Sequence, residues 1–163
     1  MATITGTLSS FNATGTIHIG DPLSQHPTKV EKNVEITGSL TATNVIFNHD
    51  LVVKGPLQLN AVTIGGKLIA NGPLHAIAIN VIQGIVCTNP HVYLTKSSTP
   101  NIGVHIRHSN DLTPVKVFLQ AHSHVGTIAF HSRGPKGEVH IDATSSVKEV
   151  HNGILIAHQT SKL

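Results

Sequence analysis

Pairs of apolar residues separated by one position recur along this chain at a constant spacing. The clearest pairs are Val34/Ile36, Leu51/Val53, Leu68/Ala70 and Ile85/Cys87. Equivalent members of successive pairs are 17 positions apart, as 51 − 34 shows. Alternation of this kind places every second side chain on one face of an extended strand, and it does not fit the 3.6-residue period of a helix. We therefore predict short β-strands and no long helix.

The same spacing extends to other positions, so the chain contains a 17-residue internal repeat. Four ungapped blocks cover 21–37, 38–54, 55–71 and 72–88. Each block opens with Asp or Gly, followed by Pro or Ser, and has leucine third. These leucines are Leu23, Leu40, Leu57 and Leu74. Further apolar pairs lie in the middle of the blocks, namely Val45/Phe47, Val62/Ile64 and Ile79/Val81. Three short strands per block predict one turn of a three-sided coil.

The residues that open each block are typical of corners between strands. Glycine permits a left-handed or tight backbone there, and proline has no N–H to contribute to a strand ladder. Stacking equivalent strands of successive blocks gives parallel sheets around an apolar interior. The expected fold is all-β, a single-domain parallel β-helix, or β-solenoid.

The repeat becomes longer in the second half of the chain. We expect regular turns over 4–88, with Ile17 and Ile19 in the same positions as the later pairs. Beyond residue 88, the pairs Val104/Ile106, Ile128/Phe130 and Ile154/Ile156 continue this series. From position 85 to 104, 128 and 154, the successive steps are 19, 24 and 26 positions. Longer steps predict loops inserted at corners, at 96–101, 109–114, 132–136 and 144–149. We expect one domain over 1–163, with about eight turns of 17 or more residues.

The register GSLTA…NVIF…DLVVKG, with one three-sided turn every 17 positions, resembles the bactofilins over residues 4–88. This resemblance implies a right-handed parallel β-helix that polymerises end to end into cytoskeletal filaments without nucleotide. The long histidine-rich turns after residue 100 depart from that family. The left-handed hexapeptide β-helix of acyltransferases is the nearest enzyme-bearing shape. Its strict six-residue units do not fit, because the step from the third to the eighth position of each block is five residues.

Composition narrows the possible partners. Aromatic residues make up 3% and charged residues 12% of the chain, against roughly 25% charged in average domains. The net charge is +3, yet the lysines do not cluster and the two arginines are Arg107 and Arg133. Binding to nucleic acid needs a stripe of phosphate-facing charge, so we expect no nucleic-acid partner.

The candidate signals for cellular location are few. A membrane-spanning helix needs an apolar run of about 18 residues or more, which this chain lacks, so we expect no transmembrane segment. The first residues lack the basic and apolar regions of a secretory signal, which leads us to expect a cytoplasmic protein. The final Ser161-Lys162-Leu163 matches the peroxisomal address, which has meaning only in a eukaryote.

Thirteen histidines are the most conspicuous chemical feature. The candidate metal ligands are His122, His124, His131 and His140. His122-x-His124 would place two imidazoles on one side of an extended segment, and His131 and His140 could approach from adjacent turns. The favoured interpretation is different: histidines such as His18, between two isoleucines, simply occupy outward positions. We therefore expect no metal and no other cofactor.

Residues for catalysis are scarce. No serine lies in a Gly-x-Ser-x-Gly motif, and Cys87 occupies a core position, where it is expected to act as a small apolar filler. Asp111, Glu138 and Asp142 are the candidate carboxylates for a polysaccharide-cleaving groove. We expect no enzymatic activity. The alternative is a ligand-binding or enzymatic β-helix with a carbohydrate or histidine–metal site in the long C-terminal corners.

The two ends of such a coil are the expected assembly surfaces, because an open β-edge pairs readily with another strand. The first turn presents Ile4, Leu8 and Phe11, and the last presents Ile154, Leu155 and Ile156. The leading hypothesis is a structural protein that self-assembles end to end into a filament, as a cytoskeletal or fibre scaffold. Its partner would be a second copy of itself.

Overall fold

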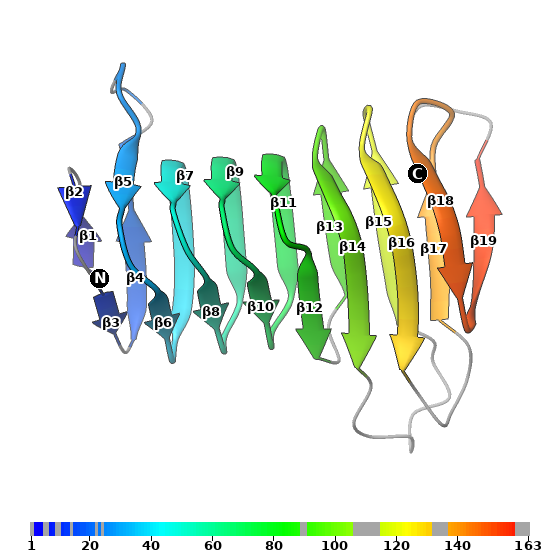
Figure 1. Ribbon diagram of the computed structural model, residues 1–163, viewed down its shortest axis with the longest axis horizontal. Helices are drawn as coiled ribbons and strands as arrows, with labels where there is room; N and C mark the ends of the chain where they lie inside the picture. Colours follow the sequence, from blue (N-terminus) through cyan, green and yellow to red (C-terminus); the bar gives the residue numbers. More distant parts are fainter. Residues whose placement is uncertain are drawn as a thin grey trace.

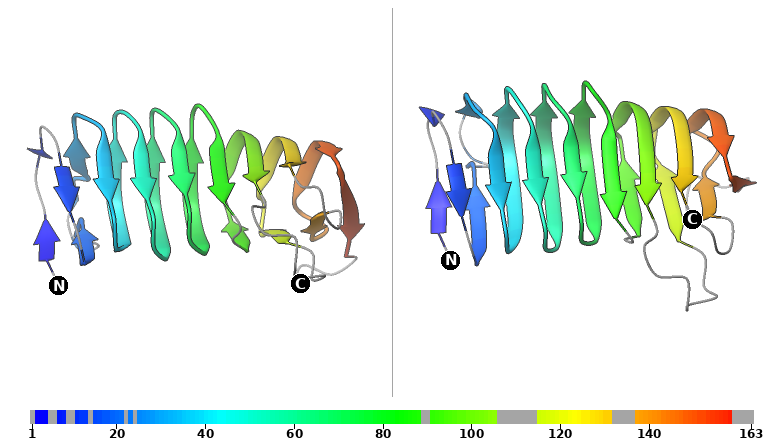
Figure 2. Two further views of the ribbon diagram at one scale, coloured as in Figure 1. Left: turned by 90° about the horizontal axis from the view of Figure 1, so that it is seen from below. Right: turned by 60° about the horizontal axis from the view of Figure 1, so that its bottom comes forward.

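The fold is a rod of short parallel strands that follow one another along its long axis (Figures 1 and 2). The computed structural model describes residues 2–4, 7–8, 11–13, 15–21, 23, 25–88, 91–105, 115–131 and 137–158, with side chains from residue 15 onward. All regular structure in these ranges is β-strand, joined into one parallel sheet. This arrangement confirms the all-β prediction and is consistent with a β-solenoid.

The strands stack in three ladders. The first ladder contains β1 (Ala2–Ile4), β4 (Thr16–Ile19), the first parts of β7 (Ser39–Phe47), β9 (Leu57–Ile64) and β11 (Leu74–Val81), then β13 (Val92–Thr95), β15 (Lys116–Gln120), β17 (Gly137–Ile141) and β19 (Gly153–Ala157). The second contains β2 (Thr7–Leu8), β5 (Thr28–Val30), the last parts of β7, β9 and β11, and the first parts of β14 (Ser98–His105), β16 (His124–His131) and β18 (Ser146–His151).

The third ladder contains β3 (Phe11–Ala13), β6 (Val34–Ile36), β8 (Leu51–Val53), β10 (Leu68–Ala70), β12 (Ile85–Thr88) and the last parts of β14, β16 and β18. Three ladders agree with the predicted three-sided turn. In the part of the chain that the structure describes, no helix is long and apolar enough to cross a membrane.

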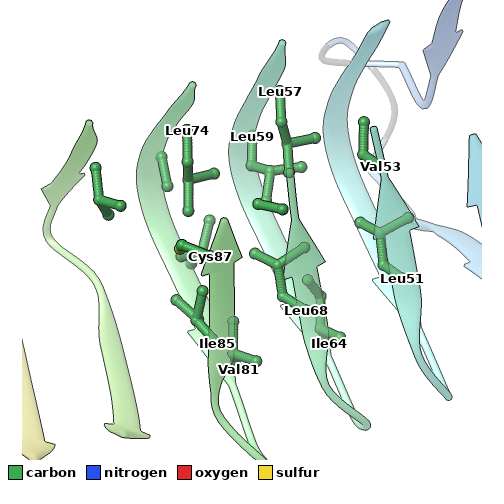
Figure 3. Close-up of a cluster of buried hydrophobic side chains, with 14 of the residues drawn as sticks. Leu51, Val53, Leu57, Leu59, Ile64, Leu68, Leu74, Val81, Ile85 and Cys87 are labelled. Carbon is green, nitrogen blue, oxygen red and sulfur yellow. The ribbon is translucent and has the colours of Figure 1, made fainter. Parts of the chain in front are cut away.

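The core consists of aliphatic columns that run along the rod. Alternate residues of each strand point inward, so each core side chain packs on its equivalent in the next turn. Leu57 lies opposite Leu74, and Leu68 lies opposite Ile85 (Figure 3). Cys87 follows Ala70 in the same column and is fully buried, as the sequence predicts. Short β-branched and leucine side chains suit this narrow interior, which explains the low aromatic content.

The 17-residue register begins later than predicted. Ile17 and Ile19 belong to the first ladder, opposite Leu40 and Ala42, so this step is 40 − 17 = 23 positions. The side chain of Leu23 is 91% exposed and does not join the leucine column. The physical reason is a corner excursion between β4 and β5, which absorbs the opening residues of the block at 21–37. The expectation of uniform turns from residue 4 was therefore wrong.

The register of the later turns also differs from the prediction. Ile85 and Cys87 lie opposite Ile102 and Val104, which keeps the regular step of 17 positions. Ile102 lies opposite Ile128, a step of 26 positions. The predicted pairing with Val104/Ile106 was two residues out of step, because strict alternation looks the same after a shift of two.

Two of the four predicted loops are largely strand. β14 begins within 96–101 and β18 begins within 144–149. The other two, 109–114 and 132–136, lie outside the described residues. The segments 98–101 and 146–149 form strands despite their polar residues. In a strand of this rod only the inward positions must be small or apolar, and the outward positions accept polar side chains.

The glycines that open the blocks are needed for close contact and not for a left-handed backbone. A Cβ on Gly38 would lie 1.8 Å from the carbonyl oxygen of Gly15, and one on Gly72 would lie 2.5 Å from that of Gly55. Successive turns approach so closely at this corner that no side chain fits between them. The left-handed corner lies instead between the first and second ladders, at Asn44 and at the equivalent alanines 61 and 78.

Substitution of Gly55 by alanine should destabilise the fold. The new Cβ would lie 2.6 Å from the Gly38 oxygen, so backbone must move, at a cost of about 1–3 kcal/mol. Gly103→Ala is the matched control, because a Cβ there would come no closer than 3.8 Å to the His105 ring. Denaturant unfolding of both variants measures the difference, and equal stability would contradict the close contact.

Substitution of Ala61 or Ala78 by glycine should stabilise the fold. Both alanines have left-handed φ angles, 55° and 56°, which cost an alanine roughly 1 kcal/mol or more. We expect each variant to gain up to about 1 kcal/mol in free energy of unfolding. Ala129→Gly, in the middle of β16, should instead lose about 0.5–1 kcal/mol. If all three glycine variants changed the free energy of unfolding in the same direction, the assigned corner geometry would be wrong.

Candidate functional site

A row of stacked rings runs along the outward face of the first ladder. It consists of His75, Tyr93, Phe118, His140 and His158, which we call the ring row. Ring centroids of the first three are 4.6 and 4.8 Å apart, with interplanar angles of 9° and 2°. The spacing matches the separation of neighbouring strands, because His75, Tyr93, Phe118 and His140 occupy equivalent positions of successive turns. His158 follows β19 and stacks on His140, although the residue opposite His140 in the register is Ile156.

Sequence reasoning missed the ring row because its members are unevenly spaced. His75 and Tyr93 are 93 − 75 = 18 positions apart, whereas Tyr93 and Phe118 are 118 − 93 = 25 positions apart. The available signal was local: each of the first four ring residues lies between two inward-pointing aliphatic residues, as Tyr93 does between Val92 and Leu94. Only the correct strand register places these outward positions in one line.

The C-terminal end of the ring row carries a hydrogen-bonded chain of three side chains. His140 Nε2 lies 2.9 Å from Glu138 Oε1, and His140 Nδ1 lies 3.0 Å from His158 Nε2. With neutral rings, His140 donates to the carboxylate and accepts from the Nε2–H of His158. This arrangement orients both imidazoles and leaves His140 with no free nitrogen for a metal.

The four candidate metal ligands are not brought together. His131 stacks on His105 at 4.6 Å in the third ladder, whereas His140 is part of the first. His122 has a left-handed φ of 66° at a corner, so the prediction that it shares one side of an extended segment with His124 was wrong. The His124 ring contacts Ser146 Oγ at 2.8 Å. Among the described residues, no group of three His, Cys, Asp or Glu could hold a metal ion.

Buried serines stabilise the corner between the first and second ladders in the longer turns. The Ser97 backbone N–H donates to Ser123 Oγ at 3.2 Å, and the Ser123 N–H donates to Ser145 Oγ at 3.1 Å. The hydroxyl of Ser123 in turn donates to the Gln120 carbonyl at 2.8 Å. Each hydroxyl therefore satisfies backbone groups that the irregular corner would otherwise bury without partners.

Asp142 completes this corner as an acceptor of hydrogen bonds. Burial of the carboxyl raises its pKa, but bonds from the Ala121 N–H, the Thr144 hydroxyl and N–H, and the Ser145 hydroxyl outweigh burial and lower the pKa to about 2. Its carboxylate is thus committed to holding two turns together, and Glu138 to His140. The third candidate carboxylate, Asp111, lies outside the described residues.

Cys87 behaves as a small apolar core residue. Burial raises the pKa of its thiol to about 12, so the nucleophilic thiolate is suppressed at neutral pH.

A hollow opens on the outward face of the first ladder, beside the first ring of the ring row. Its volume is ≈ 380 Å³, and it lies over β7, β9 and β11. The outward side chains that line it are Thr41, Thr43, Gln58, Asn60, His75 and Ile77. The outward lining combines hydroxyls, amides, one ring and one aliphatic side chain, so the hollow offers both hydrogen-bonding groups and apolar surface.

The predicted assembly residues at the C-terminal end are at least partly accessible. Ile154 is 50% and Leu155 is 47% exposed, and Ile156 is partly buried. Leu155 lies opposite the fully buried Val139, so it continues a core column at the last turn. Ile154 and Ile156 lie opposite Glu138 and His140 and point outward. The side chains of Ile4, Leu8 and Phe11 lie outside the described residues.

No family model, curated protein or solved structure matches this chain.

Replacement of Asp142 by asparagine should weaken the fold at neutral pH and reduce its sensitivity to acid. Because the folded-state pKa is lowered, the carboxylate stabilises the fold above the unfolded value near 3.8, and this stabilisation is lost as pH falls through about 2. After allowance for partial screening by solvent, this lowering of the Asp142 pKa corresponds to about 1–2 kcal/mol of stability. Denaturant unfolding from pH 7 to pH 2 measures it, with Glu149→Gln as a control for net charge. An unchanged pH profile in Asp142→Asn would contradict this role.

Proposed function

We propose that this protein is a non-enzymatic scaffold, a right-handed, three-sided β-solenoid of about eight turns that assembles end to end into filaments. The observation that carries the proposal is the exposure of Leu155. From Ile17 onward, the residues that precede it in its core column are all buried, and they are Ile17, Leu40, Leu57, Leu74, Val92, Val117 and Val139. Leu155 has the same inward position, and no strand of the described residues stacks on it beyond β19.

The backbone at this end supports the same proposal. β19 pairs with β17 on one side, and within the described residues no strand pairs with its other edge. The N–H and C=O groups on this edge have no strand partner in the part of the chain that the structure describes, and they lie next to the exposed Leu155. An edge of this kind templates further strand addition. A second copy of the chain could pair with the edge of β19 and bury Leu155 in the same contact.

The end of the rod would be covered best by a turn of a second copy, because that turn has the same three-sided shape. Figure 1 shows β1, β2 and β3 at one end of the rod and β18 and β19 at the other. Each end contributes strands to the same three ladders, so a head-to-tail contact would continue all three in register. The resemblance of residues 4–88 to the bactofilins favours the same mode of assembly. A tail-to-tail contact through β19 would instead give an apolar filament.

Substitution of Leu155 by lysine should abolish assembly and leave the fold intact. Burying an unpaired ammonium in the contact costs far more than the contact gains. The matched control is Ile82→Lys, because Ile82 is 52% exposed at a corner in the middle of the rod. Sedimentation velocity and negative-stain microscopy measure assembly, and circular dichroism checks the fold.

Wild-type protein and Ile82→Lys should form elongated species that grow with concentration, and Leu155→Lys should sediment as a monomer. Assembly by Leu155→Lys at the wild-type level would overturn the proposed contact. A monomeric wild-type protein at every concentration would overturn the scaffold function itself.

A further inference from the structure

We infer that the hollow beside His75 binds a ring of a neutral oligosaccharide. The site lies on the side of the rod and not at its ends, so the inference does not depend on end-to-end assembly. It also differs in place from the long C-terminal corners, where the alternative hypothesis from the sequence placed a carbohydrate or metal site.

The hollow lies where the ring row stops. Tyr93 is stacked between His75 and Phe118, so both of its faces are covered. His75 stacks on Tyr93, while the residue opposite it in the preceding turn is Gln58, which has no ring. The row of rings therefore gives way to a hollow of ≈ 380 Å³, with His75 as one of its walls. A ligand ring placed there would lie beside His75 and Gln58, which both line the hollow.

The charge of the hollow selects against ionic ligands. Its lining residues in the described part of the chain include no Lys, Arg, Asp or Glu. An anionic sugar, a nucleotide or an oligonucleotide would find no cation to compensate the loss of water around its charge. A neutral ligand meets no such penalty.

The polar groups of the hollow match vicinal hydroxyls. Gln58 and Asn60 each offer two N–H donors and one carbonyl acceptor, and Thr41 and Thr43 offer hydroxyls that both donate and accept. A sugar ring carries neighbouring hydroxyls that need both roles, together with an apolar C–H face. The His75 ring and the side chain of Ile77 offer apolar surface to that face.

The size and direction of the hollow fit one or two sugar rings of a chain that lies along the rod. The volume is near the lower end of the usual range of ligand sites, roughly 300–1,000 Å³. Polar positions continue beyond it in register, since Asn60 and Ile77 are followed by Thr95 and Gln120. A linear glycan could therefore extend past the hollow without meeting a charged side chain in this line.

The experiment uses the full chain and a panel of neutral gluco- and manno-oligosaccharides, with an oligogalacturonate and a short oligonucleotide as charged probes. Saturation-transfer NMR detects binding, and titration gives the dissociation constants. The test variants are His75→Ala and Gln58→Ala. His105→Ala is the matched control, because His105 also ends a ring stack but lies in the third ladder.

At least one neutral oligosaccharide should bind at millimolar concentration or below, and each test variant should lower its affinity roughly tenfold. His105→Ala should bind as the wild type does. The inference is overturned if no neutral probe binds, if binding survives in both test variants, or if a charged probe binds in preference to them. Leu155→Lys should retain binding, so a failure here is separate from a failure of assembly.

Discussion

The whole molecule depends on one constraint: each side chain must pack on its equivalent in the next turn, one strand spacing away. Inside the rod this requirement selects aliphatic residues of similar size, as in the column from Leu57 through Leu74. At the corner near Gly38 it forbids any side chain, because successive backbones nearly touch. Outside the rod it aligns whatever occupies the outward positions, which is why four unevenly spaced aromatic and histidine residues, 75, 93, 118 and 140, become one stack.

The sequence predicted the regular part of the fold well, and the physical reason is the constancy of this spacing. From Val34 to Cys87 the strand register could be read directly, because every inward position is apolar and every step is equal. Where a corner takes extra residues the period alone no longer identifies partners. Leu23 has the correct offset in the repeat yet lies on an exposed excursion. The pair Val104/Ile106 was chosen in place of the observed pair Ile102/Val104.

The candidate sites were harder to predict than the fold, since they depend on register between distant segments. The candidate histidines at 122 and 124 do not share one side of an extended segment, because His122 is a left-handed corner residue that redirects the chain. The hollow at Gln58 and His75 was not anticipated, because amides and threonines in alternating strands look like ordinary solvated positions. Buried serines such as Ser123 gave no signal either, since their role is to satisfy backbone groups of neighbouring turns.

The two proposals use different surfaces of the same rod, and this separation follows from the solenoid architecture. The ends offer open strands and an incompletely covered core at Leu155, whereas the side offers fixed rows of outward residues. A filament would repeat the hollow at every subunit, and many weak sites along one fibre would bind a polymeric glycan with avidity. A scaffold of this kind needs no catalytic group.

The most direct test of the central claim, assembly with the strand ladders continuous across the subunit boundary, is diffraction or electron cryomicroscopy of the assembled protein. The account predicts a filament whose strands lie perpendicular to its axis, with a repeat of about 4.8 Å that continues through each junction. Subunits that associate through their sides, or a protein that stays monomeric at high concentration, would contradict it.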